Sequence, residues 1–458
     1  MSAHKLFGTA GIRGKYLDFV TPHLASKLGF ALGHFLKNKG SVAIGYDSRT
    51  TRDVLFDAFA SALLSSGINV YDLGEVPVTV VGFASLFSYD ASVMITASHN
   101  PPEYNGFKFY RNGREFLRSE ESDIEKFTNQ SPSYVKWNFV GSYHKKDLSI
   151  EYMNYLIKFI RNNREKLRIA VDCVNGATSR YTPYLLTKLG HTVVSINAQS
   201  DGYFPAHLAE PSERNLEDTI NIVKELDVDF AIAHDGDGDR IAVITSDGTF
   251  INTSRIIALM SSYELSKTKS NLVITTIDTS YAIDFIVSKH NAEVIRTRLG
   301  GLVNEIVNQP DKSVAFASEP WKPIFPYLGL WIDGIFGALR LTEMISNSDK
   351  SLNELLLEIP NYPMVRKNFY CSEESKDLIF KYISEHLPFV FKEKSSVDLF
   401  DGIRINMSNG SWVLIRKSGT EPKIRLYAEA SNSSELNSIV SKTENIIKMA
   451  FDEFGELS

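Results

Sequence analysis

The amino-acid sequence predicts an α/β fold: three similar mixed α/β domains and a smaller α+β C-terminal domain around a central cleft. The first observation is a strand that ends on aspartate, then a helix and a second strand, found three times, around Asp47, Asp172 and Asp278. The second is that this pattern stops after Pro360, where paired strands and an amphipathic helix follow. Alternating strands and helices form parallel sheets covered by helices, and the repeat is too long for a solenoid. Chance similarity among βα units is the alternative explanation.

The first unit begins with a glycine-rich turn that contains Arg13, followed by a helix from Pro22 to Asn38 with leucines at helical spacing. A strand from Val42 to Tyr46, a helix from about Asp53 to Ser65 and a strand near Val70 complete it. In the later units, strands at 169–171 and 272–277 lead into helices that end at Leu189 and His290, before strands near Val193 and Val294. The remainder has paired strands near 402–415 and 423–430 and a helix from about Ser434 to Phe451.

A later apolar strand in each unit ends on a polar loop. These loops are TASHNP with Ser98, DGDGDR with Asp235, and the loop that begins at Glu319. Open α/β sheets bind ligands beyond the carboxyl ends of their strands, so we expect the three loops to face one cleft. Joints near Ser142, Asn252 and Pro360 predict domains at 1–142, 143–252, 253–360 and 361–458.

Composition excludes several functional classes. The 458 residues are 43% hydrophobic and 23% charged, and the net charge of −6 argues against nucleic acid as the main partner. No apolar run approaches the roughly 20 residues needed to span a bilayer, and the first residues lack the apolar core of a signal peptide. The two cysteines, Cys173 and Cys371, fit buried reduced thiols, so we expect a cytoplasmic protein. Nothing in the sequence indicates the oligomeric state.

The strongest local motif is the run from Asp235 to Arg240. Three carboxylates alternate with glycine, and oxygen ligands of this kind favour a hard cation such as Mg²⁺. An EF-hand is excluded because its sixth and twelfth positions would be Arg240 and Ser246. A solvated acidic turn is the alternative, although three crowded carboxylates repel one another without a cation.

A second motif, from Arg416 to Pro422, joins two cations, two hydroxyls and a glycine into a candidate phosphate cradle. The strand after it carries Arg425 on the opposite face from its apolar residues. An ordinary basic hairpin loop is the alternative here, as a proline-terminated loop is for Ser98 and His99. Taken together, a hydroxyl, a carboxylate metal loop and a separate phosphate clamp predict phosphoryl transfer, supported by Arg240 and Lys108. The separate clamp predicts a substrate that already carries a phosphate.

With TASHNP, DGDGDR, the glutamate loop and RKSGTEP in this order over nearly its whole length, the chain resembles the α-D-phosphohexomutase superfamily, which includes phosphomannomutase/phosphoglucomutase and phosphoglucosamine mutase. The resemblance implies reversible phosphoryl transfer between the 1- and 6-positions of a hexose phosphate through a phosphoserine. It also implies Mg²⁺, a phosphosugar substrate and a catalytic sugar 1,6-bisphosphate as activator. The four predicted domains would be, in order, the phosphoserine, metal-binding, sugar-binding and phosphate-binding domains.

The resemblance also implies roles for individual residues. Ser98 would carry the phosphoryl group and, with Asp235, Asp237 and Asp239, hold the magnesium ion. Around the reacting group would lie Arg13, His99, Lys108 and Arg240, with Lys108 either the general acid/base, tuned by Arg13 or His99, or a purely electrostatic group. Glu319 would accept two sugar hydroxyls, and the distal phosphate would meet Arg416, Ser418, Gly419 and Thr420.

The sugar loop departs from the family's pattern. Where the family commonly has Gly-Glu-x-Ser-Gly-His, this chain has a run from Ser318 to Pro323, and the usual Asn or His beside Leu299-Gly300-Gly301 is missing. Trp321 in this loop is either a stacking platform for the sugar or a packing residue. The resemblance implies a mannose or glucose phosphate mutase, with phosphoglucosamine mutase as the alternative; the altered loop bears on the sugar and not on the transfer, and makes a phosphopentomutase a less favoured third interpretation. A metal-dependent phosphatase and a non-catalytic sugar-phosphate binding protein are the other classes.

Overall fold

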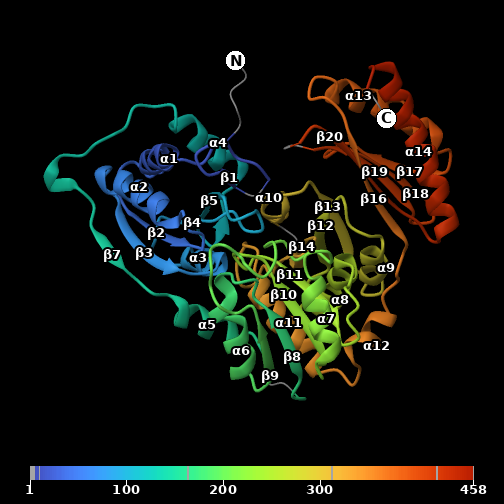
Figure 1. Cartoon of the computed structure of the whole chain (residues 1–458), viewed down its shortest axis with the longest axis horizontal. Coiled ribbons are helices and arrows are strands. Elements are labelled where there is room, and N and C mark those ends of the chain that lie inside the picture. The colour runs from blue at the N-terminus through green and yellow to red at the C-terminus, as the bar shows by residue number, and fades with distance from the viewer. Residues whose placement is uncertain (1–5, 10, 162–163, 311–312, 419–420, 457–458) are drawn as a thin grey trace.

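The computed structural model describes residues 6–9, 11–161, 164–310, 313–418 and 421–456. In this part of the chain the strands form four separate sheets that follow one another along the sequence (Figure 1). The first three sheets mix parallel and antiparallel pairs, and the last is wholly antiparallel. The predicted fold class is confirmed.

The first three sheets share one strand order. Each has a central strand with parallel neighbours on both sides, and the outer strand on one side continues into an antiparallel hairpin. The matching orders are β3-β2-β4-β5, β9-β8-β10-β11 and β13-β12-β14-β15. This common order supports the predicted triplication. It also places the loops after β4, β10 and β14 at equivalent positions.

In the first sheet the strands are β1 (Ile12–Lys15), β2 (Ser41–Tyr46), β3 (Asn69–Glu75), β4 (Ala91–Ile95), β5 (Tyr104–Arg111), β6 (Arg114–Glu115) and β7 (Tyr143–Lys145). Its helices are α1 (Pro22–Phe35), α2 (Arg52–Ser65), α3 (Val78–Ala84) and α4 (Arg118–Phe127). Because β7 pairs with β3, this sheet extends past the predicted joint at Ser142.

The second sheet contains β8 (Arg168–Asp172), β9 (Thr192–Ile196), β10 (Phe230–His234) and β11 (Ile241–Thr245), with helices α5 (Ser149–Ile157), α6 (Thr182–Lys188) and α7 (Glu217–Glu225). The third contains β12 (Leu272–Thr276), β13 (Glu293–Thr297), β14 (Val314–Glu319) and β15 (Lys322–Ile324), with α8 (Thr253–Lys267), α9 (Ala282–Ser288), α10 (Leu302–Val307), α11 (Gly334–Ser346) and α12 (Leu352–Leu357).

Helix α11 joins the second and third sheets. Every residue of α11 is buried, and the helix contacts α6 and β11 on one side and β15 on the other. Its two charged residues, Arg340 and Glu343, are buried as an ion pair with each other. Its apolar residues belong to a continuous hydrophobic cluster that includes side chains from both sheets. This shared core fixes the loop after β10 relative to the loop after β14.

The C-terminal sheet consists of β16 (Met364–Tyr370), β17 (Lys394–Asp398), β18 (Ile403–Met407), β19 (Trp412–Lys417) and β20 (Lys423–Glu429) in the order β16-β20-β19-β18-β17. Helices α13 (Lys376–Val390) and α14 (Ser433–Glu453) pack on it (Figure 1). Among the described residues, no helix combines the length and the apolar character that crossing a membrane requires.

Candidate active site

The serine loop and the acidic loop meet in the structure. Ser98, just after β4, donates a hydrogen bond of 2.6 Å from its Oγ to Oδ2 of Asp235, just after β10. Both side chains are fully buried, and the two residues are 137 positions apart in sequence. The equivalent ends of two similar sheets therefore face each other, as the strand-end pattern predicted.

A local hydrogen-bond network shapes the serine loop. Ser98 has a left-handed backbone with φ of 53°, which is uncommon outside glycine and occurs at functional sites. Thr96 Oγ1 accepts the Ser98 amide proton at 2.7 Å and donates its own proton to Oδ2 of Asp47, also at 2.7 Å. Asp47, which follows β2, thus holds the neighbouring loop and lies outside the group of three aspartates that could bind a metal.

Arg49 holds the serine loop in place through hydrogen bonds to its backbone. Its guanidinium is buried, pairs with Asp47 at 3.1 Å and donates to four backbone carbonyl oxygens that follow β4. These carbonyls belong to Ser98 (2.8 Å), Asn100 (2.7 Å), Pro101 (2.5 Å) and Tyr104 (2.9 Å). One cation therefore orders the whole segment that presents the hydroxyl.

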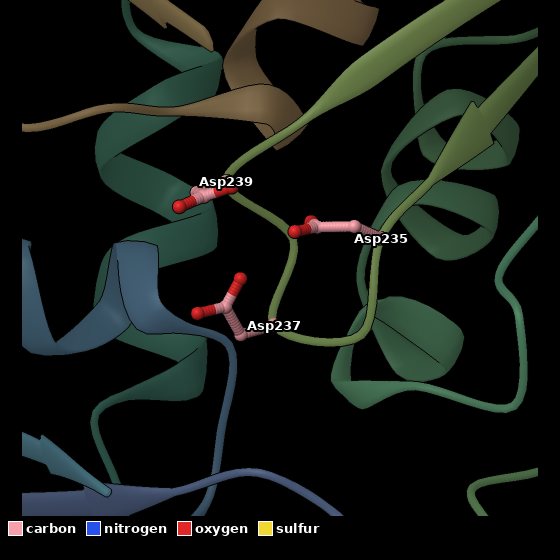
Figure 2. A group of neighbouring side chains, drawn as sticks. All are labelled: Asp235, Asp237 and Asp239. Carbon is pink, nitrogen blue, oxygen red and sulfur yellow. The ribbon is translucent and has the colours of Figure 1, made fainter. Parts of the chain in front are cut away.

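The three aspartates lie on the tight turn between β10 and β11 (Figure 2). Asp235, Asp237 and Asp239 are buried, and each offers a carboxylate oxygen within 4.8 Å of the others. Burial and then the mutual repulsion raise the pKa of Asp235 well above its usual range. Oδ1 of Asp237 and Oδ1 of Asp239 are buried without a hydrogen-bond partner. Unpaired, crowded carboxylate oxygens of this kind fit a hard divalent cation.

Lys108 on β5 faces this cluster. Its Nζ donates to Oδ2 of Asp237 at 2.9 Å and to Oδ2 of Asp239 at 2.7 Å. Burial alone would lower the pKa of Lys108, but the attraction of the two carboxylates outweighs burial and raises it. The ammonium group therefore stays charged at the edge of the cluster.

His99 lies between two arginines. Its Nδ1 is 2.7 Å from Nη2 of Arg240, 3.3 Å from Nη1 of Arg13 and 3.3 Å from Oγ of Ser98. Burial, followed by the arginine charges, lowers the pKa of His99 well below its usual value. A neutral imidazole can accept a hydrogen bond from one of these arginines. Other guanidinium nitrogens, Nε and Nη2 of Arg13 and Nε of Arg240, are buried without a hydrogen-bond partner. These guanidinium groups have donors left for an anion at Ser98.

The sugar loop is a hairpin between β14 and β15. Glu319 lies at its start, where Oε1 accepts the Gly300 amide proton at 2.7 Å. Trp321 is partly buried against the hydrophobic core of the second sheet, and the Arg240 guanidinium lies 5.8 Å from its ring centroid. This position supports the packing interpretation of Trp321 more than the stacking one.

The distal clamp forms a separate group in the C-terminal domain. Nη2 of Arg416 donates at 2.9 Å to Asp401, whose other oxygen accepts the Leu299 amide proton at 3.0 Å. Ser418 Oγ lies 3.5 Å from Nη2 of Arg425, and Nε of both Arg416 and Arg425 is buried without a partner. The predicted phosphate-binding residues Gly419 and Thr420 lie outside the described residues.

Sequence reasoning missed several residues of the site. Arg49 and Thr96 hold the serine loop, and Glu115 and Lys322 line the same cavity as Lys108, Asp239 and Glu319. Burial raises the pKa of Glu115 to about 7. The run Asp47-Ser48-Arg49 after β2 carried one signal for Arg49, because the two charges of an Asp-x-Arg sequence can form a local ion pair. No comparable spacing signal exists for Glu115.

Comparison with known proteins supplies independent findings. Four family models match consecutive parts of the chain: phosphoglucomutase/phosphomannomutase alpha/beta/alpha domains I, II and III over residues 4–135, 150–248 and 252–362, and the C-terminal domain over 385–446. A probable phosphoglucosamine mutase of Methanobrevibacter smithii is 37% identical over 98% of this chain and 99% of its own. The phosphoglucosamine mutase of Methanococcus vannielii is 38% identical over 97% and 98%. A phosphoglucomutase/phosphomannomutase family protein of Burkholderia thailandensis superposes with a TM-score of 0.86 at 25% identity, covering 98% of each chain.

Proposed function

Because the chain belongs to the phosphoglucomutase/phosphomannomutase family of phosphohexomutases, we propose that it moves a phosphoryl group reversibly between the 1- and 6-positions of glucosamine phosphate. The names of the relatives favour this sugar over the mannose and glucose phosphates that the motifs put first. A mannose or glucose phosphate mutase is the second candidate, since the matching family models carry that description. The class of enzyme, a phosphohexomutase, is common to both.

One observation carries the proposal: the Ser98 hydroxyl lies 2.6 Å from Asp235, in a buried cluster of carboxylates, two of which have an oxygen without a hydrogen-bond partner. A serine hydroxyl beside a site for a hard cation is suited to accept and donate a phosphoryl group. In this proposal Asp235, Asp237 and Asp239, with oxygens of the phosphoryl group on Ser98, hold Mg²⁺. When bound, the ion supplies charge neutralisation at the phosphoryl oxygens.

The transfer begins from Ser98 in its phosphorylated form. A hydroxyl oxygen of the sugar monophosphate attacks phosphorus, so that a new O–P bond forms while the bond to Ser98 Oγ breaks and leaves its electron pair on Oγ. Over the whole step the proton of the sugar hydroxyl ends on Ser98 Oγ, so that no proton is gained or lost. The sugar 1,6-bisphosphate then turns round, and its other phosphoryl group returns to Ser98 by the reverse chemistry.

The neighbouring cations have separate tasks in this scheme. Arg13 and Arg240 reach towards the reacting group with donors that no protein acceptor occupies, and His99 lies between them. Lys108 is bound by two carboxylates, and this geometry supports the electrostatic role over general acid/base catalysis. Arg416, Ser418 and Arg425 would grip the phosphate that does not react, and Glu319 the sugar hydroxyls.

A coupled assay with glucosamine, glucose and mannose phosphates tests the proposal. With Mg²⁺ and a catalytic amount of glucose 1,6-bisphosphate, we expect the highest kcat/KM for glucosamine phosphate and no turnover by Ser98→Ala. Mass spectrometry should find one phosphoryl group on the Ser98 peptide. Preference for glucose or mannose phosphate would select the second candidate, and turnover of pentose phosphates alone would reject both.

Two other outcomes would point to a different class of protein. Steady release of inorganic phosphate without isomerised sugar would indicate a phosphatase. Tight binding of sugar phosphate with no turnover, retained in Ser98→Ala, would indicate a binding protein. A Ser98 that stays unmodified when glucose 1,6-bisphosphate is present would contradict the phosphoserine scheme itself.

A further inference from the structure

Lys322, the first residue of β15, is a buried cation whose Nζ has no hydrogen-bond acceptor among the described residues. It is directly opposite Glu319 across the hairpin, so both side chains lie on one face of the sheet. Its Nζ is 3.9 Å from Glu319 Oε2, and both residues are 8% exposed. This contact, too long for a hydrogen bond, is the only ion pair that Lys322 makes within the described chain.

A buried ammonium group without hydrogen bonds is stabilised by an anion that binds beside it. Removing an ammonium group from water is costly unless a counter-charge and hydrogen bonds replace the lost hydration. Glu319 supplies part of the charge, but its Oε1 is already bound to the Gly300 amide. The three N–H donors of Lys322 are therefore available to oxygen atoms of a ligand.

Lys322 lines a cavity beside the acidic loop. It lines the same space as Lys108, Asp239 and Glu319. Lys108 in this cavity donates to Asp237 and Asp239 of the acidic loop. The same loop accepts the Ser98 hydroxyl proton through Asp235, so Lys322 lies on the side of the acidic loop that Lys108 occupies.

The turn before Lys322 is held rigidly. Trp321 has a left-handed backbone with φ of 65°, a strained conformation for a bulky residue. Contacts on both sides maintain it: the Trp321 amide donates to Thr253 Oγ1, and its carbonyl accepts from the Ile241 amide, both at 2.9 Å. Ile241 begins β11, directly after the acidic loop, so the position of Lys322 is tied to the aspartates.

We propose that Lys322 is a catalytic residue whose ammonium group binds oxygens of the phosphoryl group during its transfer between Ser98 and the sugar. The proposal rests on the phosphoryl-transfer function above and adds a contact from the sugar loop to the reacting group. In the step, the O–P bond to the sugar forms while the bond to Ser98 Oγ breaks. Lys322 transfers no proton in this step, and its ammonium group neutralises charge on the oxygens that leave with phosphorus.

Single-turnover phosphorylation of Ser98 by glucose 1,6-bisphosphate tests this role without reference to the preferred sugar. In the full-length protein with Mg²⁺, Lys322→Met should slow the transfer about 100-fold or more, the usual loss for one preorganised donor. Lys322→Arg, which keeps the charge, should recover most of the rate. The matched control is Lys367→Met, which removes a half-exposed lysine paired with Glu444 on the C-terminal domain and should leave the rate unchanged.

Calorimetric binding of the sugar monophosphate separates catalysis from a structural role. If Lys322 only shapes the loop around Glu319, then Lys322→Met should weaken binding together with the rate. If Lys322 binds the moving phosphoryl group, binding should stay within about threefold while the rate falls, because the lost contact belongs to the transition state. Should Lys322→Met fail to fold, Lys322→Gln, which keeps a polar stem, carries the same expectation of a slow transfer.

Transfer at the wild-type rate in Lys322→Met or Lys322→Gln would overturn the proposal, as would a parallel loss of binding and rate. A wild-type protein whose Ser98 is never phosphorylated would instead overturn the proposed function. The two failures are distinguishable because the first is a comparison of variants and the second concerns the native chain.

Discussion

Replacing Arg49 by methionine should detach the loop that carries Ser98 from Asp47, the residue that follows β2. The Arg49 side chain is 0% exposed and makes one ion pair, with Asp47, besides its four hydrogen bonds to backbone carbonyls. Methionine fills similar space but donates nothing. The buried Asp47 carboxylate would then lack its counter-charge, and the loop that carries Ser98 would lose all four of these contacts.

The size of the effect follows from this burial. Removing one partner of a buried ion pair costs about 3–5 kcal/mol, because the remaining charge is uncompensated. Each backbone carbonyl that stays buried without a donor would add about 1–3 kcal/mol, so the loop should instead move towards water. We therefore expect the free energy of unfolding to fall by about 3–5 kcal/mol and Ser98 phosphorylation to slow sharply, since a displaced hydroxyl is no longer aligned.

Urea unfolding and single-turnover phosphorylation of Ser98 measure the two effects. Arg52→Met is the matched control: Arg52 begins the helix after the same strand, is 28% exposed, pairs with Glu75 and Asp53, and should cost under about 1 kcal/mol. Arg49→Lys keeps a charge for Asp47 but cannot reach four carbonyls. Its loss of stability and its phosphorylation rate should therefore lie between those of Arg49→Met and Arg52→Met. An Arg49→Met protein that unfolds within about 1 kcal/mol of wild type and transfers at the same rate would refute this account.

Three further predictions follow from the site and its surroundings. Mg²⁺ should raise the thermal midpoint of the wild type but much less that of Asp237→Asn, and chelation should stop turnover; equal shifts would exclude the acidic loop as the site. Asp401→Asn should raise KM for the sugar monophosphate about tenfold with a smaller change in kcat, because Arg416 loses the carboxylate that orients it; an unchanged KM in steady-state kinetics would contradict this. Burial would lower the pKa of His207, but its hydrogen bond to Asp172 and the attraction of that carboxylate raise it. Stability from this pair is therefore complete below about pH 6.5 and lost as pH rises through the higher folded-state pKa, so thermal midpoints from pH 6 to 9 should fall less in His207→Gln than in wild type.

Much of the fold could be predicted because strand ends and repeats are local features of sequence. The helix predicted to reach Asn38 ends at Phe35 because Lys37 and Asn38 have left-handed backbones with φ of 60° and 56°. The joint placed at Ser142 falls short of β7, whose three residues pair with β3 through a contact between segments 73 positions apart. Contacts over such separations leave no periodic pattern in the sequence.

The residues missed at the site share this property. Lys322 lies in a loop recognised as unusual, but its importance depends on the hairpin register that places it opposite Glu319. Arg49 bonds to carbonyl groups about 50 positions away, and backbone acceptors carry no residue signature. The motif residues could be found because their side chains alone specify chemistry, whereas the supporting residues act through geometry that only the folded chain defines.

The loop of Leu299 and Gly300 links Glu319 to Arg416, the residues proposed to bind the sugar hydroxyls and the distal phosphate. Leu299 donates its amide proton to Asp401, the partner of Arg416, while Gly300 donates to Glu319 and accepts from Arg118 of the first domain. Gly300 has φ of 68°, and a Cβ there would lie 2.1 Å from the Thr9 carbonyl, so only glycine fits. Residues of the first, third and C-terminal domains therefore meet at Leu299 and Gly300. In the proposed scheme, a sugar bisphosphate that turns would therefore be expected to disturb Glu319 and Arg416 together, because both are hydrogen-bonded, directly or through Asp401, to this one loop.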